Sequence, residues 1–403
     1  MKKDEERLSP RASRRLIYLL TVLVSVVFLY AGNRLAAAGG GYLPSLTDGG
    51  LLRARVTAVT GRETFETEGI VAGQTVQNLT IRFTARLDGG GTVSAQQVID
   101  GYSSVQLQEV RPGDRITLYP NPDPATAAEA PYVIDDYLRV DGMLAFCAVF
   151  LVLLLIFGRM KGFNTVVSLL LTCGAVFAVF LPLVLGGFNI YASAVAICIY
   201  VTVSTLLIVN GPGKKTLVAV AGCSAGILFA GVLTLVMSAV MRLSGMASQE
   251  AIYLADLATR NPVDLKAVVF AAILIGAMGA IMDVAMSLAS ALWELREKAA
   301  APSFGMLMKS GMNIGRDMMS TMANTLVLAY IGSSLATVLL LTAYSASVEG
   351  LLNREMIVTE VLQAVIGSMA ILVTIPLTSL AASAVYMRGA APSRRTDGDG
   401  EKE

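Results

Sequence analysis

GAMGAIMDVAMSLASALWEL at residues 276–295 and SGMNIGRDMMSTMANTLVLAYIG at residues 310–332 are the two segments that decide the fold. Each belongs to a long apolar run, and a short charged turn joins the two runs. Asp283 is the only charged residue between Ala267 and Ala291. At 1.5 Å per residue it lies roughly 15 Å from Trp293, near the middle of a hydrocarbon layer about 30 Å thick. The first run is therefore expected to cross a membrane with a carboxyl group at mid-depth.

Asp283 belongs to a stripe of small and polar residues along one face of the first helix. A carboxylate in the hydrocarbon costs about 2.5–3.5 kcal/mol, so Asp283 is expected to face protein or water rather than lipid. Glycines on this face would let another helix approach closely, and the serines would offer hydrogen bonds to the carboxyl. A purely structural Asp and an ion-binding Asp remain equal alternatives. At 100° per residue, this Asp283 stripe contains Ala272, Gly276, Gly279, Asp283, Ser287, Ser290 and Glu294.

The second segment begins with Arg316 and Asp317 at the predicted membrane edge, where a solvated pair of charges is the alternative to a functional one. Asn324 lies about 9 Å further in at the helical rise. Ser287 and Asn324 would then reach similar depths, because a short connection favours antiparallel neighbours. One face of this helix, the Asn324 stripe, contains Asn313, Asp317, Thr321, Asn324, Leu328 and Ile331.

These two segments resemble the signature of the YibE/F-like family of bacterial multi-pass membrane proteins. The resemblance extends across the whole chain and is weakest in the exported domain and the tails. It implies an inner-membrane protein and leaves the mechanism open. The matching strings are Gly276–Ala277, Gly279–Ala280, Met282–Ser287, Ala289–Ser290, Ser310–Asp317, Thr321–Met322, Asn324–Leu326 and Leu328–Gly332.

Composition excludes several classes of function. Apolar residues make up 55% of the 403 and charged residues only 15%, which is too apolar for a soluble protein of this length. The net charge of +1 gives no sign of nucleic-acid binding. The chain has no histidine, which removes Ser-His and Cys-His catalysis and every His-ligated metal site. We therefore expect no enzyme activity, no cofactor and no metal.

About eight membrane helices are expected, in an α-helical polytopic protein of a bacterial plasma membrane. Basic residues concentrate in alternate connections, which predicts that both termini are cytoplasmic. Ala36–Ala38 would suit a signal peptidase, so a cleaved leader is the alternative to a retained anchor. The apolar runs are 16–31, 143–157, 165–185, 190–209, 216–241, 267–292, 318–342 and 356–387. The predicted parts are an N-terminal tail (1–15), a signal-anchor (16–31), an exported domain (35–140), a seven-helix membrane domain (141–387) and a C-terminal tail (388–403).

The exported domain is expected to be β-rich, lying between the first and second membrane helices. Apolar and polar residues alternate within it, and turn signals occur at residues 88–91 and 111–114. The pattern predicts a small barrel or sandwich of five or six strands. It carries no catalytic motif, so an accessory domain without a ligand is the simplest interpretation. The expected strands are 52–60, 76–86, 92–98, 116–119 and 132–134.

Two functions are weighed. In the first, the protein is a secondary transporter or channel-like permease in which Asp283 binds a proton or cation and a small solute or ion crosses the bilayer. In the second, it is a non-catalytic assembly protein whose β domain binds a partner; a homo-oligomer is left open. An aspartyl hydrolase built on Asp283 and Asp317 is disfavoured, because the two predicted depths differ by about 15 Å. The candidate pathway is Asp283, Ser287, Ser290, Arg316, Asp317, Thr321 and Asn324, with Glu360 as a weaker candidate.

Overall fold

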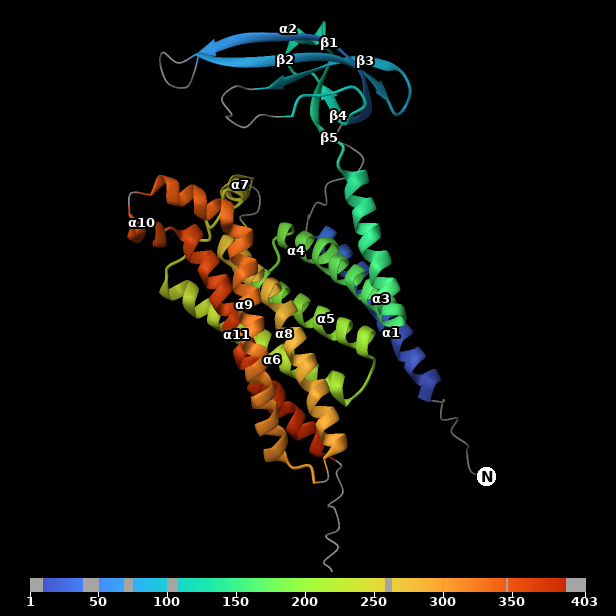
Figure 1. The fold of residues 1–403 in the computed structure, drawn as a ribbon, viewed down its shortest axis with the longest axis vertical. Helices are drawn as coiled ribbons and strands as arrows, with labels where there is room; N and C mark the ends of the chain where they lie inside the picture. Colours follow the sequence, from blue (N-terminus) through green and yellow to red (C-terminus); the bar gives the residue numbers. More distant parts are fainter. Residues whose placement is uncertain are drawn as a thin grey trace, which may run out of the picture. The chain divides into compact units, whose positions relative to one another are not determined.

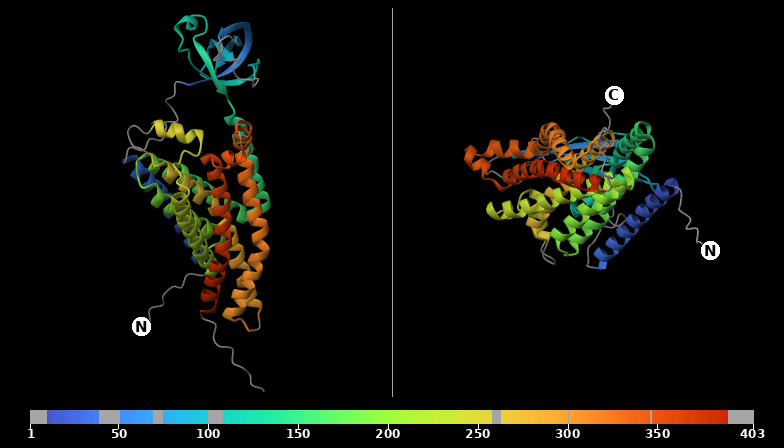
Figure 2. Two further views of the ribbon diagram at one scale, coloured as in Figure 1. Left: turned by 90° about the vertical axis from the view of Figure 1, so that its left-hand side faces the viewer. Right: turned by 90° about the horizontal axis from the view of Figure 1, so that it is seen from below.

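The computed structural model describes residues 10–38, 51–68, 75–99, 108–257, 263–299, 301–345 and 347–388. The chain divides into two compact units, shown in Figures 1 and 2. One unit, Pro44–Leu153, contains a small β-barrel, and the other contains residues 1–43 and Leu154–Glu403. Each unit is described separately below.

Five strands close into a barrel, so the barrel rather than the sandwich is the architecture adopted. The strand order is β1-β2-β3-β5-β4, and the barrel closes because β1 also pairs with β4. β3 and β5 run parallel, whereas the other neighbours are antiparallel. The strands are β1 (Leu52–Glu68), β2 (Thr75–Leu87), β3 (Thr92–Ile99), β4 (Arg115–Pro120) and β5 (Tyr132–Tyr137), with the short helix α2 (Pro124–Ala127) between β4 and β5.

Alternation along the strands fills the barrel. Ile81, Phe83 and Ala85 on β2 are fully buried, as period-two spacing requires when one face meets the core. β1 continues eight residues beyond the expected Thr60, although its second half is polar. That half is held by backbone pairing with β2, with Phe65 opposite Asn78, and so it needs no apolar face.

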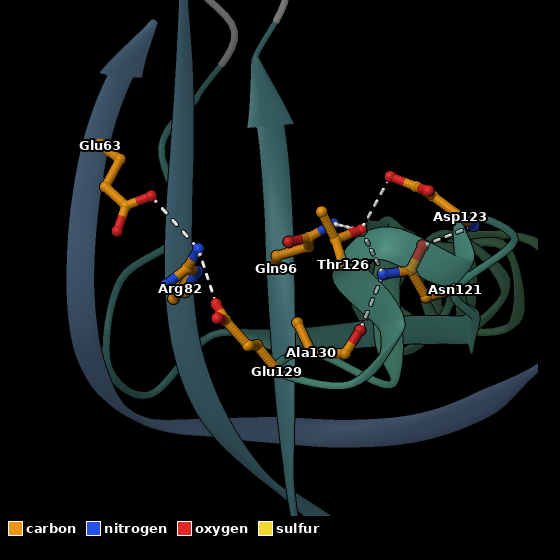
Figure 3. Close-up of polar contacts among 8 residues, drawn as sticks. All are labelled: Glu63, Arg82, Gln96, Asn121, Asp123, Thr126, Glu129 and Ala130. Atoms are coloured by element: carbon orange, nitrogen blue, oxygen red, sulfur yellow. Dashed lines mark hydrogen bonds and ion pairs between the residues drawn. The ribbon is translucent and has the colours of Figure 1, made fainter.

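Polar side chains tie the outer surface of the barrel together (Figure 3). Arg82 on β2 forms ion pairs with Glu63 at 3.2 Å and with Glu129 at 2.9 Å. A second cluster fixes α2 between β4 and β5, since the Thr126 hydroxyl donates to Asp123 and accepts from two amides. Both clusters join neighbouring strands and turns, although the buried Nε of Arg82 has no hydrogen-bond partner among the described residues. The second cluster contains Gln96, Asn121, Asp123, Thr126 and Ala130.

Among the described residues, seven helical segments are long and apolar enough to cross a membrane, which indicates a membrane protein. They are the Leu16–Ala38 part of α1 (Pro10–Ala38), the joined stretch Val140–Leu185, α5 (Ile190–Asn210), α6 (Lys214–Val240), α8 (Leu265–Lys298), α9 (Phe304–Tyr344) and α11 (Glu355–Met387). The joined stretch consists of α3 (Val140–Gly174), the π-helical turn η1 (Ala175–Phe180) and α4 (Leu181–Leu185). Two shorter helices are α7 (Gln249–Leu257) and α10 (Val348–Leu352).

Seven rather than eight candidate spans are found because two expected helices form one stretch with a break. Arg159 interrupts α3 with φ 48° and ψ −127°, a conformation rare for a residue with a side chain. The chain turns sharply there, since a Cβ atom on Gly162 would overlap the carbonyl group of Leu154. The break falls in the polar connection expected at Arg159 and Lys161.

The core of the helical unit is apolar, and at several points in it glycines meet hydroxyl-bearing side chains of a neighbouring helix. Gly222 on α6 packs against Thr378 of α11, and Gly311 on α9 packs against Ser379 of α11. Small residues of this kind let helices approach closely in membrane proteins. α11 is consequently the central helix, contacting α6, α8 and α9 along its length.

Candidate functional site

The Asp283 stripe lies on an open face of α8. Asp283, Ser287 and Glu294 are exposed, as are Ala272, Gly276 and Gly279, and only Ser290 is half-buried. The expected packing of a neighbouring helix is found at Gly276, which Tyr330 of α9 approaches closely, and is missing at Gly279, where a Cβ atom would meet nothing within 4 Å. The expected hydrogen bonds are also missing, because Asp283 has no hydrogen-bond or ion-pair partner among the described residues. Neighbouring helices cover the rest of α8 and leave most of this face, including Asp283, exposed.

The Asn324 stripe on α9 is exposed too. α9 packs on α11 through Gly311 and Gly315, whose added Cβ atoms would overlap Ser379 and Ile375. Asn324 lies about 180° around the helix from Gly315, so it is opposite the packed face. Its fellow candidates Arg316, Asp317 and Thr321 are likewise exposed, and the Thr321 hydroxyl donates to the carbonyl of Met318 in its own helix.

Two close approaches fix the register between α8 and α9. A Cβ atom on Gly311 would lie 3.1 Å from Leu292, and one on Gly276 would lie 2.5 Å from the Tyr330 hydroxyl oxygen. The helices are therefore antiparallel, as the short connection predicts. Counting along them from these contacts puts Asp283 level with Thr321.

The same register puts Ser287 level with Arg316 and Asp317, so the expected equal depth of Ser287 and Asn324 is wrong. That expectation counted each depth from an apparent membrane edge, Trp293 on one helix and Met318 on the other, and these edges are not level. The difference in depth between Asp283 and Asp317, predicted to be about 15 Å, is in this register about one helical turn along the axis, roughly 6 Å. The two carboxyl groups still lie on separate faces, so the structure does not bring them into one site.

A cavity of about 250 Å³ lies at the Leu265 end of α8, between α7, α8 and α11. Its polar lining consists of Ser248, Glu250, Thr359, Glu360 and Gln363, and most of the remaining wall is aliphatic. Thr359 is 5% exposed, and its hydroxyl has no hydrogen-bond partner within the described chain. We call this cavity the Glu360 pocket, because Glu360, the weaker candidate from the sequence, lines it.

The Glu360 pocket adjoins the Asp283 stripe. Ala272 belongs to both, since it lines the pocket and begins the stripe. One turn further along α8, Gly276 contacts Tyr330, whose buried hydroxyl is unpartnered within the described part and interacts electrostatically with Glu360. A row of polar and small groups thus runs from Glu360 to Asp283.

Sequence reasoning missed Thr359 and Glu250 as site residues. Thr359 directly precedes Glu360, but nothing local distinguishes it from the other hydroxyl residues of α11. Glu250 reaches the pocket only because α7 lies beside α8 and α11. As to metals, the described residues contain no group of three or more His, Cys, Asp or Glu side chains that could hold an ion.

Comparison with known proteins assigns the family. The family model described as YibE/F-like protein matches residues 146–388, which is more than half of the chain and includes both α8 and α9. Searches of the curated proteins and of the solved structures each found no match. The matched region contains the Asp283 stripe, the Asn324 stripe and the Glu360 pocket. The chain belongs to the YibE/F-like protein family.

Proposed function

We propose that the protein is a secondary transporter or channel-like permease that moves a proton or a small cation, with Asp283 as the binding carboxylate. The observation that carries the proposal is an exposed carboxyl group near the middle of a membrane-length helix, with no partner in the part of the chain that the structure describes. Asp283 lies 18 residues from Leu265 and 15 residues from Lys298 along α8. Ionisable residues at such a depth mark ion or substrate paths in membrane proteins.

The surroundings of Asp283 suit a water-lined path. Gly276 and Gly279 remove side-chain volume on the Leu265 side, and Ser287 and Ser290 offer hydroxyl groups on the other. Lipid contact would leave the carboxyl without any hydrogen-bond partner, which is costly in hydrocarbon. Water along the stripe would solvate the carboxyl and carry an ion to it.

The proposal includes an orientation. Arg159, Lys161, Lys214 and Lys215 lie in connections that would face the cytoplasm, in accord with the positive-inside rule. Both termini would then be cytoplasmic and residues 35–140 would lie outside, in a bacterial plasma membrane. The Glu360 pocket would open at the outer end of the stripe.

A second function, membrane assembly, is favoured by α9. Of its 41 residues only Leu307, Gly311, Gly315 and Ser334 are buried, and Asn324 lies 20 residues from either end. A polar face at that depth needs cover by protein, which a second copy or another membrane protein would supply. In this alternative the exported barrel binds a further partner and no solute crosses.

Ion flux into proteoliposomes tests the proposal. Under an imposed proton gradient the wild-type protein should acidify the lumen, and Asp283→Asn should reduce the rate at least about tenfold. Glu297→Gln is the matched control, because it makes the same chemical change on α8 and can keep its hydrogen bond from Trp293, 2.7 Å long. Wild-type flux in the Asp283→Asn protein would refute the role of Asp283. Absence of flux in the wild type, together with cross-linking through Asn324→Cys, would favour assembly.

A further inference from the structure

We infer that the Glu360 pocket binds a small organic cation, a primary alkylammonium, through Thr359, Glu360 and Gln363. The inference names the solute class for the proposed path and to that extent rests on the proposed function. It is argued from the charge, the wall and the hydrogen-bond acceptors of the pocket.

The charge of the pocket selects a cation. Its thirteen lining residues include two carboxylates, Glu250 and Glu360, and no lysine or arginine. The Glu250 backbone N–H and the Ser248 hydroxyl hold the pKa of the Glu250 carboxyl below its usual range, which keeps that group ionised. Glu355, on the preceding turn of α11, is already engaged with the backbone N–H groups of Ser244 and Gly245. The free acceptors are therefore those of Glu360 and its neighbours.

The wall of the pocket favours an organic cation over a metal ion. Leu254, Leu265, Val268 and Val269 form much of it, and such side chains offer nothing to a hydrated ion. A short alkyl chain would pack against them and be removed from water. The volume of about 250 Å³ also far exceeds the roughly 10–15 Å³ that one water molecule needs by the same measure. A bare metal ion would leave most of this space unused.

Thr359 supplies the hydrogen-bond argument. Ser368, Thr374, Ser379 and Ser383 on α11 each donate to the carbonyl four residues earlier, so their hydroxyl groups are satisfied within the helix. Among the described residues of α11, the buried hydroxyl groups of Thr359 and Thr378 have no partner, and of these two residues Thr359 lines the pocket. An ammonium group has three donors and no acceptor. The Glu360 carboxylate and the Gln363 amide oxygen provide two matching acceptors, and rotation about the Cα–Cβ bond of Thr359 would present its buried hydroxyl as the third.

Binding of n-butylammonium to the purified full-length protein tests the inference. The ligand should raise the midpoint of thermal unfolding progressively with concentration, because it binds the native state. n-Butanol, which has the same chain without the charge, and Mg²⁺ should give no comparable shift. Glu360→Gln and Thr359→Val should each lose most of the butylammonium shift. Glu349→Gln, a carboxylate change on α10 outside the pocket, should keep it.

Two variants separate this inference from the proposed function. Asp283→Asn should keep the butylammonium shift and lose proton flux, because Asp283 does not line the pocket. A butylammonium shift in a protein that moves neither protons nor butylammonium would support the site and refute the transport proposal. Proton flux without any butylammonium shift, or an equal shift in Glu360→Gln and wild type, would overturn the inference and leave the transport proposal standing. Glu360→Gln must unfold at the wild-type temperature without ligand; if it does not, Thr359→Val decides.

Discussion

Replacing Thr359 by valine should stabilise the protein, which is the reverse of what a buried threonine usually predicts. The Thr359 hydroxyl is buried without a partner among the described residues, and valine fills nearly the same volume without a polar group. Leaving a buried hydroxyl unsatisfied costs about 1–3 kcal/mol. Because water can enter the adjoining pocket, we expect the lower end, a gain of about 1 kcal/mol in the free energy of unfolding.

Thr374→Val is the matched control on the same helix. The Thr374 hydroxyl is fully buried and donates to the carbonyl of Ala370 at 2.7 Å, so valine there removes a bond that is made. Hydrogen bonds inside membrane proteins average about 0.6 kcal/mol, and the control should lose roughly that much. The two substitutions are chemically identical and should change stability in opposite directions.

Unfolding by SDS titration in mixed micelles, followed by circular dichroism, would measure both variants. A Thr359→Val protein less stable than wild type by more than about 0.5 kcal/mol would mean that its hydroxyl is satisfied. That result would remove the main hydrogen-bond argument for the ammonium site. A stabilised variant that no longer binds n-butylammonium would instead show that the protein gives up stability to hold a ligand.

Three further predictions concern other parts of the chain. Gly222→Val should cost about 1–3 kcal/mol in SDS titration because its face is filled by α11, whereas Gly279→Ala, on the open stripe, should be nearly neutral. Burial raises the pKa of Tyr137, so the folded barrel favours the protonated phenol. The stability of the barrel should therefore fall as the pH rises above about 10. In urea titrations at several pH values, Tyr137→Phe should make stability depend less on pH in this range. A topology reporter after Thr342 should read outside and one after Arg388 inside; a cytoplasmic signal at the first site would contradict the proposed orientation.

Helical periodicity predicted which residues share a face, and it did so well on α8. The residues from Ala272 to Glu294 that were expected on one stripe do lie on one surface. Whether another helix covers that surface depends on how the bundle packs, which no local pattern contains. The sequence therefore left open whether Asp283 faces protein or water, and in the structure it is exposed.

Elsewhere, features that depend on contacts between distant segments could not be predicted from the sequence. The apolar alternation that predicted the first strand stops near Thr60, yet β1 runs on to Glu68 because backbone pairing with β2 does not depend on side-chain type. The relative levels of Ser287 and Asn324 depend on where α8 and α9 touch, not on their separate hydropathy. Glu250 and Thr359 meet around one cavity although they are far apart in the chain.

The exposed position of Asp283 also bears on how α8 first enters the bilayer during synthesis. Whether a helix enters the bilayer from the translocon depends on its own hydrophobicity, because later helices have not yet been made and cannot shield its polar groups. Between Ala267 and Ala291 it has nine Leu, Ile, Val and Phe residues. Each contributes about −0.3 to −0.6 kcal/mol at the helix centre, so together they match or exceed the roughly 2.5–3.5 kcal/mol cost of one Asp over most of these ranges. α8 can therefore insert without help from α9, and its carboxyl group is free to change in evolution without endangering biogenesis.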